Sequence, residues 1–449
     1  MTQSSIKPLL NQRAFGAAGK PGDSDTPGRG LHRTLWQHLS TVSLLMVAMG
    51  LGLGTAQAQI LAYTTNQSSD TVSVIDSASN TVIATIGVGH IPTGIAITQD
   101  GSRAYVTNFG SNNISIIDTA TNTVVATIVA GLNPYGVAIT PDGTRVYVTD
   151  GYRDYTPSTV SVIDTATNTV VTTIPVGNYP TGTAITPDGT RAYVMNTYSG
   201  TASVIDTASN TVIATIPLGG IPVGVAIAPG GSRAYAADIS WDLIVIDTAT
   251  NSVAATIPVG TPPAPPLPVG VAITPDGSRA YVTNFYDSSV SIVDTATNTV
   301  VATVPAGYAP YGVAITPDGT KAYVTHIWTQ FGTVAVIDTA TNAMVASIQV
   351  GLDPIAIAIM PEKNAANLIK GLSPSVNGLN LQPGLANSLD AKLQGALASA
   401  GAGKVKTACN QANAFISAVA AQSGKMLTVD QANQLLAQAT RIKTVLGCS

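Results

Sequence analysis

Short apolar runs alternate with polar turns along the chain from about residue 60 to residue 361. Each unit reads "GVAIT", then "AYVTN", then "VSVID", then "VVATI", with "PDG" between the first two runs and "DTATN" between the last two. Runs rich in Val, Ile, Thr and Tyr that end in Gly, Pro, Asp or Asn are typical of β-strands joined by tight turns. The pattern therefore predicts four antiparallel strands in each unit.

The unit is repeated seven times. An Asp ends the third run of every copy at spacings of 41 to 47 residues, namely Asp76, Asp118, Asp164, Asp206, Asp247, Asp294 and Asp338. A four-stranded antiparallel unit that recurs at this period fits one blade of a β-propeller. We therefore predict an all-β seven-bladed propeller, whose strands are apolar on both sides because neighbouring blades stack face to face.

The two ends of the array predict how the ring closes. The repeat begins at "AYTTN", residues 62–66, without a first run ahead of it, and finishes at "IAIAIMP", residues 355–361, without a second run behind it. Each partial unit completes the other, so we expect the last strand to join the first three in one blade. This closure hides two sheet edges that would otherwise be free to pair with another chain.

The repeat wording resembles a known family. The stretch "AYVTNFGSNNISIIDTATNTVVATI", residues 104–128, is similar to the YVTN family of β-propeller repeats, which is common in exported and cell-surface bacterial and archaeal proteins. The resemblance implies a propeller over residues 59–361 and says little about function, since relatives include surface-layer proteins and the lactonase-like propellers look similar. Asp150, Asp238 and His326 depart from it by replacing the final Asn of the motif, and the fifth copy reads "AYAAD".

The copies differ on only one side of the predicted disc. The "PDG" and "DTATN" turns lie on one side, here called the turn face, and hardly vary, so we expect repeated structural roles for Arg103, Arg145, Arg191, Arg233 and Arg279. The loops between the second and third strands and the blade-to-blade connections lie on the other side, here called the loop face. Varied loops on a rigid scaffold are where binding usually resides.

Aromatic residues gather in the sequence of the loop face. They are Phe109, Tyr135, Tyr152, Tyr155, Tyr179, Tyr198, Trp241, Phe285, Tyr286, Tyr308, Tyr311, Trp328 and Phe331. Flat rings beside polar groups suit a glycan, a peptide or another protein surface. The alternative is that individual rings plug the disc beneath their own loops.

Acidic residues outside the repeat template fall on the same face. Asp150, Asp154, Asp238, Asp242 and Asp287 form a predicted acidic rim, with Asp70 and Asp353 nearby and Arg153 as the cation there. Such a rim suits a basic partner, or Ca²⁺ bound through carboxylate and carbonyl oxygens, although no spacing like that of an EF-hand is present. Ordinary turn formation by Asp is the alternative, and we expect no resident cofactor.

An enzyme would place acids, bases or metal ligands at the mouth of the central channel. The positions expected to ring that mouth are Thr93, Tyr135, Thr181, Val223, Val269, Tyr311 and Ile355, none of which is an ordinary acid or base near neutral pH. Residues 60–361 contain no Glu, no Cys and only two His. Non-catalytic binding is therefore favoured; the alternatives are a lactonase-like hydrolase that uses loop Asp residues such as Asp238 with His90 or His326, and a surface-layer structural protein.

The charge of the chain and its N-terminal segment indicate where the protein is located. The 449 residues carry a formal net charge of -4, and no cluster of Lys and Arg points to a nucleic acid. Residues 1–58 contain a basic segment, an apolar run at 41–54 and "AQA" before Gln59, which together predict a signal peptide. The apolar run falls short of the roughly 20 residues that span a bilayer. We expect export to the periplasm or cell surface; the alternative is a membrane anchor.

The tail, residues 362–449, changes to an Ala, Leu, Asn and Gln composition that predicts three or four helices. Its first helix, 385–400, carries a stripe of Leu385, Leu389, Leu393 and Leu397, and the last opens with a Thr428 and Gln431 capping box. In an exported protein, Cys409 and Cys448 predict one disulfide. The tail resembles the FIMAH domain of some secreted bacterial proteins, which favours an attachment or interaction module; a stabilising cap is the alternative.

Overall fold

The computed structural model describes residues 60–151, 158–261, 266–361 and 381–446, together with Ile369, Leu372, Val376, Leu379 and Cys448. The signal peptide predicted at residues 1–58 lies outside the described residues. Within the described ranges, no helix is both long and apolar enough to cross a membrane.

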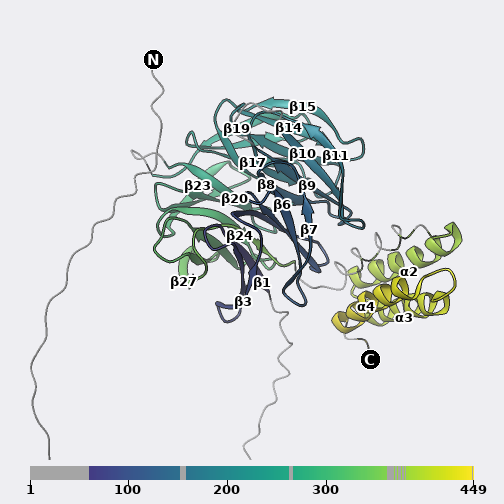
Figure 1. Ribbon diagram of the computed structural model, residues 1–449. Coiled ribbons are helices and arrows are strands. Elements are labelled where there is room, and N and C mark those ends of the chain that lie inside the picture. The colour runs from purple at the N-terminus through teal and green to yellow at the C-terminus, as the bar shows by residue number, and fades with distance from the viewer. Residues whose placement is uncertain are drawn as a thin grey trace, which may run out of the picture. The chain divides into compact units, whose positions relative to one another are not determined.

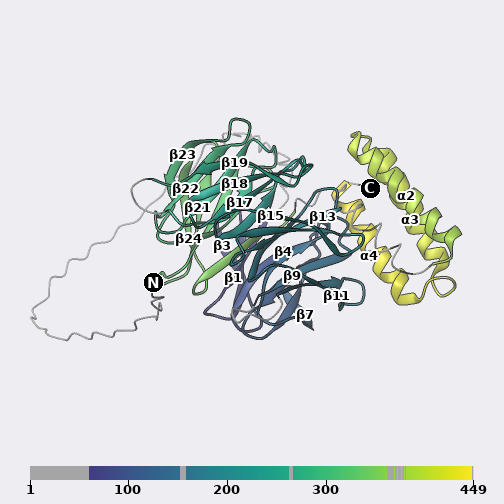
Figure 2. The same ribbon diagram turned by 90° about the horizontal axis from the view of Figure 1, so that it is seen from above.

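The described residues form 28 strands in seven four-stranded antiparallel sheets, which are arranged as blades around a centre (Figures 1 and 2). Listed from the innermost strand outward, blade A is β28 (Pro354–Ile359), β1 (Leu61–Asn66), β2 (Thr71–Asp76), β3 (Thr81–Gly87); blade B is β4 (Pro92–Ile97), β5 (Arg103–Asn108), β6 (Asn113–Asp118), β7 (Thr123–Val129); blade C is β8 (Pro134–Ile139), β9 (Arg145–Asp150), β10 (Thr159–Asp164), β11 (Thr169–Pro175); blade D is β12 (Pro180–Ile185), β13 (Arg191–Asn196), β14 (Thr201–Asp206), β15 (Thr211–Pro217). Blade E is β16 (Pro222–Ile227), β17 (Arg233–Asp238), β18 (Asp242–Asp247), β19 (Ser252–Pro258); blade F is β20 (Pro268–Ile273), β21 (Arg279–Asn284), β22 (Ser289–Asp294), β23 (Thr299–Pro305); blade G is β24 (Pro310–Ile315), β25 (Lys321–His326), β26 (Thr333–Asp338), β27 (Ala343–Gln349).

The predicted closure of the ring is confirmed. Strand β28 pairs antiparallel with β1, so that Ala62 lies opposite Ile359 although the two residues are at opposite ends of the array. Contacts between innermost strands run from blade to blade all the way round, including β28 with β4. The seven-bladed fold follows from this pairing.

The Tyr of each second strand explains why the repeat wording is copied so closely. All seven of these rings are buried between blades, namely Tyr63, Tyr105, Tyr147, Tyr193, Tyr235, Tyr281 and Tyr323. In five of them the phenol also donates to the Asn of the "DTATN" or equivalent turn in the next blade, as from Tyr63 to Asn122 Oδ1 at 2.9 Å and from Tyr147 to Asn210 Oδ1 at 2.7 Å. One residue therefore fills the space between blades and fixes their register.

A Thr in the second strand links the innermost strands. The Gly94 N–H donates to Thr107 Oγ1 at 2.7 Å, and that hydroxyl donates to the carbonyl of Tyr135 in the next blade at 2.7 Å. The same link recurs from blades A, C, F and G. Met195 in blade D and Ala237 in blade E replace the Thr, so both blades lack this particular link to the next blade. Blade D is joined to blade E by Thr181 instead, whose hydroxyl donates to the carbonyl of Val223 at 3.0 Å.

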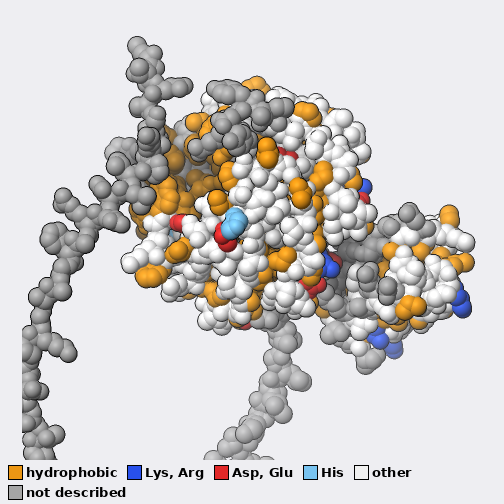
Figure 3. Space-filling model, viewed as in Figure 1, with side chains coloured by type: hydrophobic (Ala, Val, Ile, Leu, Met, Phe, Trp, Pro, Cys, Tyr) orange, Lys and Arg blue, Asp and Glu red, His pale blue; other side chains and the backbone are white. Residues whose placement is uncertain are grey.

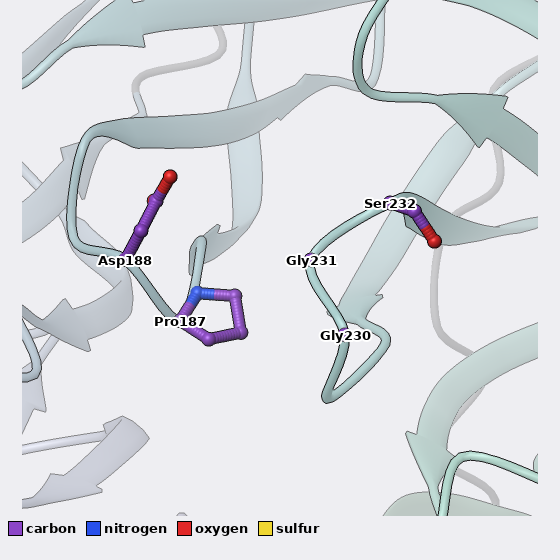
Figure 4. A pocket seen from close by; sticks show the side chains of 5 residues that line it. All are labelled: Pro187, Asp188, Gly230, Gly231 and Ser232. Atoms are coloured by element: carbon purple, nitrogen blue, oxygen red, sulfur yellow. The ribbon is translucent and has the colours of Figure 1, made fainter.

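In blade E the first turn of the turn face also departs from the repeat. In blade D, Thr186 donates to Asp188 Oδ1 at 2.5 Å and the Thr190 N–H donates to the same oxygen at 3.0 Å. Blade E has Ala228 and Gly230 in the places of that Thr and Asp, so both partners of the bond are absent together. An open hollow of about 530 Å³ lies here, with Pro187 and Asp188 on one side and Gly230 to Ser232 on the other (Figure 4).

The outermost strands form the circumference of the propeller. None of these seven strands carries a charged residue, and their third positions expose apolar side chains such as Ile83, Val125 and Val301. In every blade the pairing between the third and fourth strands contains a register shift near this position. Such bulges twist an edge strand and hinder its pairing with another sheet.

The tail contains α2 (Pro383–Gly401), α3 (Val405–Gln422) and α4 (Val429–Leu446). The predicted leucine stripe packs into their common core, where Leu389 and Leu393 are buried together with Phe415. The predicted capping box is confirmed, since the Gln431 N–H donates to Thr428 Oγ1 at 3.2 Å and the Thr428 N–H donates to Gln431 Oε1 at 2.9 Å. Cys409 and Cys448 form the expected disulfide.

Candidate functional site

The loop face surrounds the mouth of a central channel, across which two tyrosines make contact. The channel has a volume of about 200 Å³, and six of the seven residues predicted to ring its mouth line it, all but Thr181. The phenols of Tyr135 in blade C and Tyr311 in blade G meet across the mouth at 2.6 Å. Burial raises the pKa of both phenols, so both stay protonated at neutral pH and one donates to the other.

Phe285 is the centre of an aromatic cluster that includes Tyr311, one of these two tyrosines. Its ring is buried and makes edge-to-face contacts with Tyr286 at 5.1 Å, Tyr311 at 6.3 Å and Trp328 at 4.8 Å between ring centroids. Below it lies an apolar cluster that joins blades A, E, F and G and includes Val269, Ala309, Ile327 and Ile355. The packing holds the exposed rings of this sector in place.

Several aromatic side chains of the loop face project into solvent. Trp328 is 61% exposed, and Tyr198, Trp241, Tyr286, Tyr308 and Phe331 are each more than half exposed. Tyr198 stacks on Tyr179 with ring centroids 4.6 Å apart, and Phe109 packs edge-to-face on Tyr135. Large exposed apolar side chains therefore gather on this side of the propeller.

Three of these aromatics also have an unfavourable backbone conformation. The φ angle is 53° at Tyr179, 102° at Trp241 and 58° at Trp328. In other copies the position of Trp241 holds Asn112, Gly200 or Ser288, and the position of Tyr179 holds Ile91, Asn133, Leu267, Ala309 or Asp353, all with positive φ. A bulky residue with positive φ costs on the order of 1 kcal/mol or more. The conformation of Tyr179 therefore belongs to the blade connections in general, whereas Trp241 adopts it where other copies have small or polar residues.

The predicted acidic rim divides into buried and accessible carboxylates. Asp150 and Asp238 are 5% and 3% exposed, and both occupy the place of the Asn that ends the second strand. Asp150 accepts from Ser161 Oγ at 2.6 Å, and Asp238 accepts the N–H groups of Ile221 at 2.7 Å and Ser240 at 2.9 Å. Asp242 and Asp287 are only partly buried.

His326 occupies the same Asn position in blade G. It is buried, its Nδ1 lies 3.1 Å from Thr333 Oγ1, and its Nε2 contacts the carbonyl of Ala306. Burial lowers the pKa of His326. In blades A, B, D and F the Asn amide donates to third-strand side chains in the same way. These contacts explain His326 and Asp238 as parts of the scaffold.

Part of the predicted site cannot be placed. Tyr152, Asp154 and Tyr155 lie outside the described residues. Among the described residues, no group of three or more His, Cys, Asp or Glu side chains is placed to hold a metal ion.

Sequence reasoning missed three features of the loop face. The contact between Tyr135 and Tyr311 could be predicted only from the order of the blades, which places blades C and G on opposite sides of the channel. The support that Phe285 gives to its neighbours could be predicted only from contacts between aromatic side chains. The exposed aliphatic residues Leu132 and Leu352 of the blade connections were missed because the search was for aromatics; their place in the connections was the available signal.

The fold and this surface define a seven-bladed β-propeller whose varied loops converge on one aromatic face. A family model described as a YNCE-like beta-propeller matches residues 37–156, which is well under half of the chain. None of the curated proteins compared with the chain matches it.

Solved structures share the propeller fold. Hydrazine synthase of Kuenenia stuttgartiensis is 24% identical with a TM-score of 0.55, over 62% of this chain and 92% of that chain. A functionally unknown protein from Desulfotomaculum acetoxidans DSM 771 is 20% identical with a TM-score of 0.57, over 67% and 98%. The dihydro-heme d1 dehydrogenase NirN in complex with DHE is 18% identical with a TM-score of 0.50, over 68% and 76%. At these identities the similarity shows the fold alone.

Proposed function

We propose that this protein is an exported, non-catalytic binding or scaffold propeller that recognises a protein, peptide or glycan partner through its loop face. The leader at 1–58 would direct export and the tail at 362–449 would position the propeller. The observation that carries the proposal is the set of exposed aromatic rings on the loop face, of which Tyr286 and Trp328 pack against the buried Phe285. Rigid rings of this kind are typical anchors of binding surfaces.

The binding test uses the fluorescence of Trp241 and Trp328. Trp36 lies in the leader, so the Trp36→Phe variant of the full chain leaves only these two emitters. We expect a saturable change with a peptide, an envelope polysaccharide or a protein of the envelope, and we expect the double variant Trp241→Ala/Trp328→Ala to weaken binding at least tenfold, as measured by calorimetry.

The matched control replaces Val125 and Val345 by Ala. These side chains are exposed to a similar extent as Trp241 but lie on the outermost strands. Affinity should be unchanged in this control. Unchanged affinity in the tryptophan double variant, with the fold intact by circular dichroism, would show that the loop face is not the binding surface.

The hydrolase alternative would use loop Asp residues with His90 or His326. Asp238 and His326 are buried and hydrogen-bonded in the position of a structural Asn, which gives them a structural role. His90 is exposed, and its Nδ1 lies 2.7 Å from Asp70 Oδ2. Turnover of small lactones that is lost in the Asp238→Asn or His326→Asn variant would establish it over the binding proposal.

A surface-layer role has one favourable observation, the uncharged outermost strands. The bulge in each of them works against edge-to-edge pairing. Ordered assemblies of the purified protein at micromolar concentration, seen by electron microscopy, would establish this role. The YVTN and FIMAH resemblances remain predictions.

A further inference from the structure

Among the propeller residues that the structure describes, the Lys and Arg side chains lie on the turn face. Among the described propeller residues, all Lys and Arg stand at the start of a second strand, namely Arg103, Arg145, Arg191, Arg233, Arg279 and Lys321. They are held there by local acceptors: Arg145 pairs with Asp164, and Lys321 Nζ donates to the carbonyl of Ser77 at 2.7 Å. Hydrophobic and uncharged side chains cover most of the propeller surface in Figure 3, and the Lys and Arg side chains in view on it lie at its rim.

Accessible carboxylates stand beside exposed rings in the sector from blade E to blade A. Asp242 follows Trp241, and Asp287 follows Tyr286. Asp353 accepts the backbone N–H of Trp328 at 2.9 Å. Each of the three carboxylates is partly exposed, and each belongs to a residue that follows, or accepts the backbone N–H of, an aromatic residue whose side chain is more than half exposed.

These carboxylates have neutral partners. Asp353 Oδ2 accepts from Ser68 Oγ at 2.6 Å, and Asp287 Oδ2 accepts from Ser289 Oγ at 2.7 Å. Within the described ranges, neither forms an ion pair, nor does Asp242. The negative charge of this sector is therefore not cancelled by any described side chain.

An exposed ring with a neighbouring carboxylate is a favourable place for a cation. The face of Trp or Tyr attracts a cation, Arg most often, and a carboxylate beside it adds a charge-assisted hydrogen bond. The planar guanidinium can stack on the ring and donate to the carboxylate at the same time. A neutral glycan gains the stacking without the charge attraction, and an anionic one is repelled.

We propose that the loop face from blade E to blade A binds an arginine-containing, basic peptide segment of a partner protein. Trp241 with Asp242, Tyr286 with Asp287 and Trp328 with Asp353 are the three contact points, one on each of three successive blades. The inference rests on the proposed function, because it names the partner class of the same surface.

The test measures calorimetric binding of two decapeptides to the full chain. One alternates Arg and Ser; the other alternates Gln and Ser, which keeps length and polarity but removes charge. We expect the Arg peptide to bind at least tenfold more tightly, with an affinity that falls as salt is raised from 50 to about 200 mM because the attraction is screened. The Asp287→Asn/Asp353→Asn variant, which keeps the shape of both side chains, should lose most of the difference.

The control variant Asp142→Asn/Asp276→Asn removes two carboxylates from the turn face and should leave both affinities unchanged. Circular dichroism and thermal midpoints verify that each variant is folded. Equal affinity for both peptides, or tighter binding of a neutral polysaccharide that still depends on Trp241 and Trp328, would overturn the basic partner and leave the proposed function standing. No binding of either peptide or of any polysaccharide would overturn both.

Discussion

Replacing Asp150 by Asn should stabilise the propeller at neutral pH. Asp150 takes the place that Asn occupies in four other blades, and Gly131 lies so close that a Cβ there would be 2.2 Å from the carboxyl carbon. Its Oδ2 accepts from Thr159 Oγ1 at 3.1 Å and Ser161 Oγ at 2.6 Å, while its Oδ1 is buried without a described partner. An ionised carboxylate in such a site is poorly solvated.

The structure gives both the size and the sign of the effect. Burial raises the pKa of Asp150 from 3.8 to about 6. Between these values the folded state keeps a proton that the unfolded state releases, so this residue makes the free energy of unfolding fall as pH rises through the window. The full difference corresponds to about 3 kcal/mol above pH 6. An Asn does not titrate, and Asn196 shows that its amide can donate to the equivalent hydroxyls at 3.0 and 2.9 Å.

The assay is urea denaturation of parent and Asp150→Asn proteins between pH 4 and pH 8, followed by the fluorescence of Trp241 and Trp328 in the Trp36→Phe background. The variant should gain stability over the parent by about 3 kcal/mol at pH 7.5, and the gain should shrink toward pH 4. Other carboxylates titrate equally in both proteins, so the difference isolates Asp150.

Asp238→Asn is the matched control, because Asp238 stands at the same position but accepts two backbone N–H groups. It should not give a comparable gain at pH 7.5. A stability difference between Asp150→Asn and its parent that does not change with pH would refute the reasoning, since it would mean that Asp150 has an ordinary pKa in the folded protein.

Three further predictions concern the loop face and the tail. Trp241→Gly should raise stability by about 1 kcal/mol in urea denaturation, because glycine tolerates the φ of 102° and the relief exceeds the added unfolded-state entropy; a loss would show that the ring stabilises the fold. Phe285→Ala should cost about 3–5 kcal/mol in the same assay and increase the mobility of Trp328 in fluorescence anisotropy, whereas a cost below 1 kcal/mol would contradict its central place. The Cys409→Ser/Cys448→Ser variant should lower the stability of the helical tail by about 4 kcal/mol, because the disulfide closes a separation of 39 residues; unchanged helix melting at 222 nm would contradict this.

The repeat made the scaffold predictable. Seven copies, with first and last units that complete each other, require a closed ring, and the β28–β1 pairing confirms it. The capping box of Thr428 and Gln431 was equally visible, because the interaction is between residues three apart. Such local or repeated patterns specify the secondary structure and the blade architecture directly.

The candidate site was only partly predictable. The sequence could assign Asp150, Asp242 and Asp287 to one face, but it could not show that Asp150 is buried while the others are accessible. That difference depends on which atoms of the blade connections cover each carboxylate. The contact of Tyr135 with Tyr311 and the support of Trp328 by Phe285 likewise join segments from different blades.

By itself, the sequence determined the number of blades, their strand order, the turn chemistry and the face that carries the variation, because these follow from short-range periodicity repeated at a fixed interval. Only the tertiary structure decided which varied side chains reach solvent, which replace a structural Asn, and which carboxylates stand beside an open aromatic face. These properties depend on packing across the ring between residues far apart in the chain, which no local pattern specifies.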